Sequence, residues 1–483
     1  MANVPMSAGG PTPHVVFDRF RNKLLARVQE PELRRYAVLL LAAGAGLLPL
    51  MAGSAKAALT KMPTDGADTL LMLMGGALVL LMTPGLAFFY GGFTRAKNVL
   101  NTMMMSFFLM GLIGVVWVIL GYSLAFDGGF KSPFIGGLGS MWLNGVGGEL
   151  GDAPLADGFS ISASSFALFQ GMFAIITPAL ISGALVERIN FKAWFWFCLL
   201  WSLFVYCPMA KMVWGGGYIG PFGEIGAIDF AGGTVVHIAA GVGALVAAAI
   251  VGPRTGFPGN KRPPHNVPFI LLGAGLLWFG WFGFNGASYF AAKGAGFSFL
   301  TTTLSASAAL LTWCLIEWFK DGKPTAVGAA TGAVAGLVGI TPAAGFVYMP
   351  QAFAIGVLTA IGCFIAVQVK SSIQFDDSLD AFAVHGVGGT IGALLTGLLA
   401  APALVPADYF PKSAQLLASG GNGALFVAHI KAVLISYGFV GLGTAIILWI
   451  VGSVVGLRVS PEDEDRGLDF VAHGEEAYDP MTF

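Results

Sequence analysis

The sequence has little charge. Only 11% of its 483 residues are Asp, Glu, Lys or Arg, whereas typical soluble domains carry about 25%. Hydrophobic residues make up 56% and the mean hydropathy is +0.77. The formal net charge of −1 gives no electrostatic reason to expect nucleic acid as a partner. These shortages argue against soluble enzymes, disordered chains and nucleic-acid-binding domains, and they indicate that the protein's solvent is the lipid bilayer.

Cysteine is scarce as well. The four cysteines all lie in apolar stretches and show no metal-ligand spacing, so we expect small buried hydrophobic residues and neither disulfides nor ligands. Glycine is abundant by contrast, at 69 residues, and has no collagen-like period. Because helices in lipid associate by close packing over small residues, spacings such as Gly328–Gly332–Gly336 predict tight helix contacts.

The first 58 residues differ from the rest of the chain. Basic residues cluster between positions 19 and 35, an apolar run follows at 37–51, and small residues occupy 54–57. This order is typical of a secretory signal, here with a long basic part. We therefore predict a signal peptide over residues 1–58, cleaved near Ala57 or Ala58, with an uncleaved signal anchor as the alternative.

Eleven apolar runs follow, and a helix needs about 20 such residues to cross a bilayer. In chain order they are Asp68–Phe93, Val99–Phe126, Ser164–Val186, Phe191–Lys211, Phe230–Val251, Val267–Ala287, Phe297–Phe319, Ala326–Ile340, Gln351–Val369, Ser378–Ala401 and Val427–Gly456. The eighth run is the shortest and is rich in glycine. The prediction is an all-α polytopic membrane domain of eleven transmembrane helices over residues 59–456. Two glycine-rich outer segments, Gly128–Gly158 and Ala403–Gly423, have no assigned role.

The loops differ in their content of Lys and Arg. With the mature N-terminus outside, the inner loops and the tail hold about twice as many basic residues as the outer loops, which is the expected positive-inside bias. An odd number of spans then places the polar, acidic tail of residues 457–483 in the cytoplasm. We expect this tail to be soluble and available for contact with other surfaces.

Two segments of the chain resemble each other. Asp229–His237 reads DFAGGTVVH and Asp380–Thr390 reads DAFAVHGVGGT, and a Gly-Ala-Leu sequence follows each of them. They fall in the fifth and tenth runs, so two five-helix halves would have opposite orientations. Such inverted repeats are common in transporters, where the path lies at the repeat interface.

Three ionisable residues in or beside the spans need an explanation, because charge within a membrane is costly. His237 and His385 lie mid-span in the two similar segments, where they are either packing residues or parts of a shared pathway. Asp229 precedes the fifth run and is expected to be a helix N-cap that also shapes the local electric field. The spacing disfavours zinc, whereas a haem between the histidines stays open as an alternative.

Several short motifs, taken in order, resemble those of the ammonium transporter (Amt/Rh) family, in its bacterial Amt type. They are Gly85–Gly92, Arg95–Asn98, Met212–Gly217, Asp229–His237, Trp281–Asn285, Thr341–Ala343 and Phe382–Gly389, with Val455–Arg458, Gly467–Asp469 and His473–Tyr478 in the tail. The resemblance covers nearly the whole chain after the leader. It implies ammonium or ammonia transport, with methylammonium as an analogue, and no cofactor or enzymatic activity.

The resemblance also implies roles for individual residues. Trp214, Phe173 and Ser288 resemble an outer recruitment site that holds ammonium by cation–π contact and a hydroxyl acceptor. Phe173 and Phe284 resemble the stacked ring pair that gates the pore, where an apolar constriction blocks hydrated ions by its desolvation cost.

Below the gate, His237 and His385 resemble the twin histidines that line the narrow pore and relay a proton while neutral ammonia crosses. Asp229 resembles the family's aspartate beside the recruitment site, with a structural and electrostatic role.

Finally, the resemblance implies an assembly and partners. It predicts a homotrimer with one pore per subunit in the inner (plasma) membrane, and a PII-type signalling protein as a possible partner of the tail. A membrane ammonium sensor that signals through its tail is the alternative function.

Overall fold

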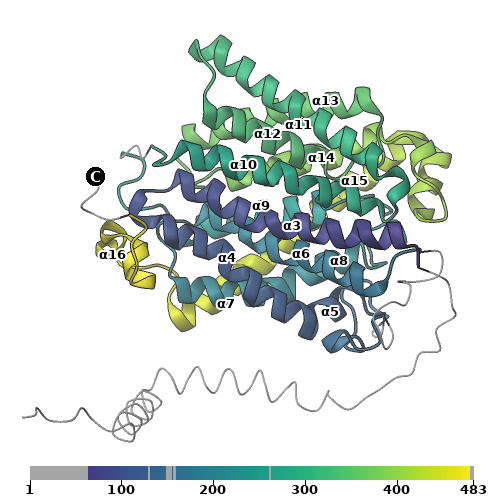
Figure 1. The fold of residues 1–483 in the computed structure, drawn as a ribbon, viewed down its shortest axis with the longest axis horizontal. Coiled ribbons are helices and arrows are strands. Elements are labelled where there is room, and N and C mark those ends of the chain that lie inside the picture. Colours follow the sequence, from purple (N-terminus) through teal and green to yellow (C-terminus); the bar gives the residue numbers. More distant parts are fainter. Residues whose placement is uncertain (1–63, 129–130, 148–154, 156–158, 260–262, 479–483) are drawn as a thin grey trace, which may run out of the picture. The chain divides into compact units, whose positions relative to one another are not determined.

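A computed structural model describes residues 64–128, 131–147, 155, 159–259 and 263–478, and in these residues helices joined by loops make up the fold (Figure 1). Within these residues the only β-type pairing is an isolated bridge between Ile189 and Arg458. The predicted signal peptide, residues 1–58, lies outside the described residues.

The membrane domain and the tail are built mainly from α-helices. They are α3 (Gly66–Phe93), α4 (Val99–Val116), α5 (Tyr122–Phe126), α6 (Ala163–Ile181), α7 (Phe191–Trp201), α8 (Cys207–Val213), α9 (Ala239–Val251), α10 (Val267–Trp281), α11 (Ala292–Asp321), α12 (Ala326–Ile340), α13 (Met349–Ser372), α14 (Val387–Leu399), α15 (Pro411–Val455) and α16 (Pro461–Arg466).

Ten helical stretches in the described ranges are long and apolar enough to cross a membrane, which confirms an all-α polytopic protein. Several combine α- and π-helical pieces; Phe191–Val213, for example, joins α7 and α8 through a π-helical turn. The eighth predicted run is also a helix, α12, but it has 15 residues and so is about 22 Å long. Most of its residues are buried, because it packs against α10, α11, α13 and α14.

The last predicted run, from Val427, lies within α15 (Pro411–Val455). A non-helical residue, Gly421 with φ +59°, divides α15 into two helical parts, and the predicted run falls in the second part. The segment before this break includes Lys412, Ser413 and Gln415, so hydropathy alone does not reveal it. Part of the unassigned outer segment Ala403–Gly423 is therefore helical.

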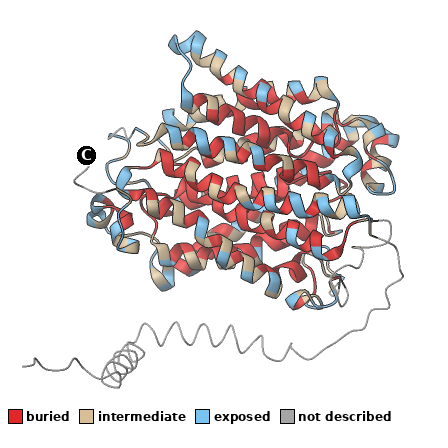
Figure 2. Cartoon of the chain, viewed as in Figure 1, coloured by how far each residue is buried: buried red, intermediate tan, exposed pale blue. Residues whose placement is uncertain are grey.

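Burial divides the helices into central and peripheral ones (Figure 2). The spans Ala163–Ala184 and Gly233–Val251 are the most buried, while α4, α11, α13 and α15 carry large exposed apolar side chains such as Leu300, Leu434 and Trp449. Apolar surface of this extent suits contact with lipid. The central helices are therefore the ones that can enclose a site.

The glycine spacing on α12 marks a close helix contact, as predicted. A Cβ atom added at Gly332 would lie 2.6 Å from the Trp313 Cβ, and one added at Gly336 would lie 2.6 Å from the Ser305 carbonyl oxygen. Both neighbours belong to α11, so glycine here lets the two backbones approach each other.

Candidate functional site

The two predicted histidines lie in contact at the centre of the bundle. His237 belongs to a π-helical turn, Gly233–Ile238, and His385 to another, Phe382–Gly386. Their Nδ1 atoms are 3.3 Å apart, and their rings stack at 5.3 Å between centroids and 24°. Both are buried. One Nδ1 must donate and the other accept, so the pair shares a single proton in this contact.

Direct contact between the rings also decides an alternative that the sequence left open. A haem held by this pair would place its macrocycle between the two imidazoles. Because the Nδ1 atoms are at hydrogen-bond distance, the geometry has no gap for such a group. The described residues also contain no cluster of three or more His, Cys, Asp or Glu side chains that could hold a metal ion.

Asp229 orders the backbone that leads to His237. Its Oδ1 accepts from the amides of Gly232 and Gly233 at 2.8 and 2.7 Å, and its Oδ2 accepts from Thr234 and Val235 at 2.7 and 3.2 Å. Four otherwise orphaned donors at a helix start are thus satisfied by one carboxylate.

The segment that carries His385 has its own capping carboxylate, Asp377. The sequence comparison aligned Asp380 with Asp229, but the amides of Ala381 and Phe382 donate to Asp377 at 3.0 and 2.8 Å. Asp377 precedes His385 by eight residues, the same spacing as between Asp229 and His237, and that spacing was the missed signal. Burial raises the pKa of Asp377 to about 6, against the opposing charge of Lys370.

A column of rings connects the histidines to Trp214. The Phe284 ring lies 5.8 Å from His237 and 4.3 Å from Phe173, and Phe173 meets Trp214 edge-on at 5.8 Å and 89°. The Trp214 indole N–H donates to the Asp229 carbonyl at 2.9 Å. The structure therefore brings together five of the predicted residues in one line.

Trp281 is part of the same column and had no role in the sequence analysis. Its ring stacks on His237 at 5.4 Å and 25°, and its indole N–H donates to Thr341 Oγ1 at 2.9 Å. The signal that could have found it is its position three residues before Phe284, one helical turn away.

Ser288 lies beside this column rather than in it. Its hydroxyl donates to the Phe284 carbonyl at 2.8 Å, and its side chain is mostly buried. Because the hydroxyl proton is used in this way, the oxygen lone pairs are left to accept from a donor.

Two small internal cavities meet at His385. The first is almost wholly apolar apart from the histidines and is lined by Met82, Leu86, Ile176, Val236, His237, Trp281, Phe284, Val334 and His385, among others. The second is lined by Phe89, Tyr90, Thr331, Asp380 and His385, among others. The His237 Nε2 atom has no hydrogen-bond partner among the described residues, so the pair offers one free polar atom to the path.

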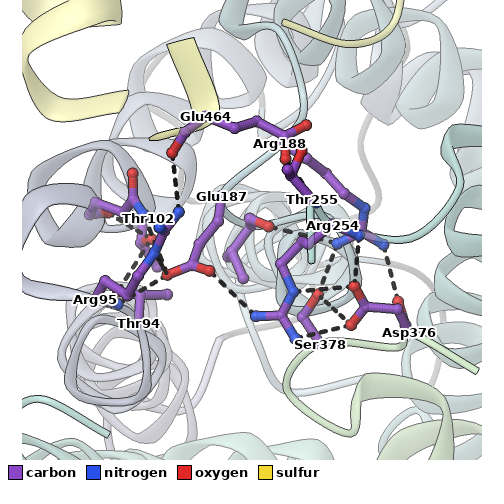
Figure 3. Close-up of polar contacts among 12 residues, drawn as sticks. Thr94, Arg95, Thr102, Glu187, Arg188, Arg254, Thr255, Asp376, Ser378 and Glu464 are labelled. Atoms are coloured by element: carbon purple, nitrogen blue, oxygen red, sulfur yellow. Dashed lines mark hydrogen bonds and ion pairs between the residues drawn. The ribbon is translucent and has the colours of Figure 1, made fainter. Parts of the chain in front are cut away.

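A buried ion cluster closes the tail-side end of the bundle (Figure 3). Glu187 accepts from the amide and Nε of Arg95 at 2.8 and 3.2 Å and pairs with Arg254 at 3.3 Å. Arg254 also contacts Asp376 at 2.8 Å, and Arg188 donates to the Asp376 carbonyl. Burial alone would raise the pKa of Glu187, but Arg254 and Arg95 hold it at about 2. The sequence analysis used these arginines only as loop charges.

The tail joins this cluster. The Glu464 carboxylate accepts from Arg458 and from the Thr255 amide, and the Glu464 carbonyl accepts from Arg95 at 3.0 Å. Further along the chain, Asp469 accepts from the Asn101 amide at 2.8 Å. Although the tail is acidic, it is packed against the loops rather than solvated along its length.

Gly467 provides a test of this tail packing. It has φ +110°, and a Cβ there would lie 2.7 Å from the Lys97 carbonyl oxygen. Gly467→Ala is expected to release the tail and to speed tryptic cleavage after Arg466 at least about threefold, since local opening controls proteolysis. Gly474→Ala is the matched control, because that glycine has φ +69° but open space around it. Equal cleavage in both variants would contradict the contact.

These features define a class: a polytopic helical membrane protein with a buried path of aromatic and histidine rings. The profile of the Ammonium Transporter Family matches residues 70–478, which is most of the chain. The chain belongs to this family and is a multi-pass protein of the plasma membrane.

Similar proteins cover the same region. An ammonium transporter of Bacillus subtilis (strain 168) is 45% identical over 416 residues, which are 85% of this chain and 98% of the relative. One of Mycobacterium tuberculosis (strain H37Rv) is 45% identical over 436 residues, or 86% and 91%. Among solved structures, Saccharomyces cerevisiae Mep2 superposes with a TM-score of 0.75 at 35% identity, covering 87% of this chain and 93% of its own. A Sensor Amt Protein gives 0.75 at 29%, covering 84% and 98%.

Proposed function

We propose that the protein moves ammonium across the plasma membrane along the ring column between Trp214 and the histidine pair. The observation that carries this proposal is the continuous sequence of ring contacts from Trp214 through Phe173 and Phe284 to His237 and His385. The named ammonium transporters that cover most of this chain support the choice of substrate.

Recruitment takes place at the outer end of this column. The Trp214 ring and the neighbouring Phe173 offer aromatic faces to a small cation, an attraction of about 0.5–2 kcal/mol that grows with desolvation. Ser288 adds a hydroxyl oxygen whose own proton is already donated to the Phe284 carbonyl. Such an acceptor favours a cation that donates hydrogen bonds, so it selects ammonium or methylammonium over potassium.

Passage below the recruitment site requires the loss of charge. The stacked Phe173 and Phe284 rings, 4.3 Å apart, exclude hydrated ions, and a bare cation in the apolar cavity beyond them is very costly. Ammonium therefore gives up its proton above the cavity, and neutral ammonia crosses. The imidazoles of His237 and His385, joined through their Nδ1 atoms, carry the proton because each can donate and accept.

The fold and the family support a topology and an assembly as part of the same proposal. We place α12 as an eleventh, short span, with the N-terminus outside, the tail in the cytoplasm and the two five-helix halves inverted. A cleaved leader over residues 1–58, a homotrimer and a PII-type partner at the docked tail complete the proposal.

A sensor role is the second candidate. It is favoured by the similarity to a Sensor Amt Protein and by the docking of the tail on the Glu187 cluster, which couples the tail to membrane helices. Transport is measured directly in liposomes, and wild-type flux no greater than that of empty liposomes would favour the sensor over the transporter.

Trp214→Leu tests the recruitment site in reconstituted liposomes. Uptake of methylammonium should show an apparent KM about five- to thirtyfold higher than wild type, since an aromatic face worth roughly 1–2 kcal/mol is lost. Phe222→Leu removes an exposed aromatic ring outside the column and is expected to leave KM unchanged. An unaltered KM in Trp214→Leu would remove this residue from recruitment.

A further inference from the structure

We propose that Lys211 is a positioning residue of the outer cation site, one that ties the turn carrying Trp214 to the loop after α5 and thereby sets the apparent affinity for ammonium. This inference rests on the proposed function of Trp214. Lys211 lies three residues before Trp214, in the last turn of α8, and only 7% of it is exposed.

A buried ammonium group needs a reason, because burying an unpaired charge is costly. Here the Lys211 Nζ donates to the Gly215 carbonyl at 2.7 Å and to the Asp127 carbonyl at 3.5 Å. Gly215 follows the end of α8 at Val213, and Asp127 caps the end of α5 at Phe126. The cation therefore lies between the C-terminal ends of two helices, where unsatisfied carbonyl groups and helix dipoles favour positive charge.

Backbone hydrogen bonds from Ala210 and Lys211 hold the same turn. The Trp214 and Gly215 amides both donate to the Ala210 carbonyl, and the Gly217 amide donates to the Lys211 carbonyl at 3.0 Å. The side chain then crosses from the start of this turn to the Gly215 carbonyl. Lys211 therefore closes a tight loop that contains Trp214, and it restricts where the indole can lie.

On its other side, Lys211 contacts Asp127, which is itself held by hydrogen bonds. The Asp127 carboxylate accepts from the Ser140 amide at 2.7 Å, and the Tyr218 amide donates to the Pro133 carbonyl at 2.9 Å. The described part of the glycine-rich outer segment, residues 131–147, thus packs beside the Trp214 turn. Lys211 links Asp127, which precedes this segment, to the turn.

The proposed role predicts a specific kinetic change. Lys211→Met keeps an unbranched side chain one atom shorter but removes its charge and donors, so the indole loses its fixed position. In liposomes the apparent KM for methylammonium should rise about three- to tenfold, the effect of one or two hydrogen bonds, while Vmax stays within about twofold. Lys131→Met removes an exposed charge from the same outer segment and should leave both parameters unchanged.

A double variant shows whether Lys211 acts through Trp214. In a Trp214→Leu background, Lys211→Met should raise KM no further, because residues that act as one unit are not additive. A full additional increase would overturn the positioning role. A lower KM in Lys211→Met would do so as well, because it would show that the charge repels the substrate directly.

The outcomes separate this inference from the proposed function. If Trp214→Leu raises KM and Lys211→Met does not, only the positioning role fails. If Trp214→Leu itself has no effect, the recruitment site fails. Lys211→Gln, which is neutral but polar, carries the same prediction of a raised KM should the methionine variant not reach the membrane.

Discussion

Replacing either His237 or His385 with alanine is expected to lower methylammonium uptake by liposomes about a hundredfold, the scale of a lost acid–base group. The two imidazoles touch through Nδ1 atoms 3.3 Å apart, and both line the apolar cavity. Each alanine removes one of the two imidazoles that line this cavity and breaks the Nδ1 contact through which the proton passes, while ammonium still cannot enter with its charge.

His429→Ala provides the matched control for these variants. His429 is also a buried histidine in a membrane helix, α15, but its Nε2 accepts from the Ile228 amide and it lies outside the ring column. We expect this variant to retain wild-type uptake. If both pair variants kept the wild-type rate and the preference for ammonium over potassium, His237 and His385 would be packing residues.

The second large effect concerns stability. Asp229→Ala should destabilise the protein by about 4 kcal/mol or more, because four backbone N–H groups in the buried turn lose their acceptor at about 1 kcal/mol or more each. We expect little protein to survive purification, and any that does to aggregate at a much lower temperature in size-exclusion melts. Such a loss exceeds the usual effect of a single substitution.

Asp377→Ala is the comparison built into the repeat. Its carboxylate accepts two amides where Asp229 accepts four, so about half the loss of stability is expected. Asp229→Asn keeps an oxygen acceptor for some of the donors and should be intermediate. Equal melting temperatures for wild type and Asp229→Ala would show that the capping contacts contribute no stability.

The sequence predicted the order of the helical runs, and ten of the described helices are long and apolar enough to span, because a helix in lipid must be apolar over its full length. It missed the helical segment from Pro411 to the break at Gly421, because polar residues such as Lys412 place that segment outside any apolar window.

The sequence comparison paired the two similar segments, but it did not pair their capping carboxylates. Sequence similarity aligned Asp380 with Asp229, whereas the residue that caps the second segment is Asp377. A carboxylate caps a helix when the free backbone amides of the first turn donate to it. Which carboxylate this is depends on where the turn begins and not on the identity of the neighbouring residues. The cluster around Glu187 stayed hidden for a related reason, because its partners come from loops separated by 67 to 92 positions in the chain.

By itself, the sequence determined that this chain is a helical membrane protein with two similar histidine segments, because low charge, long apolar runs and motif order are properties of the chain alone. The tertiary structure decided that the two histidines meet, that the aromatic rings form a column above them, and that Lys211 reaches two helix ends. These facts depend on contacts between segments far apart in the chain. Such contacts follow from the packing of the helices, which no local pattern encodes.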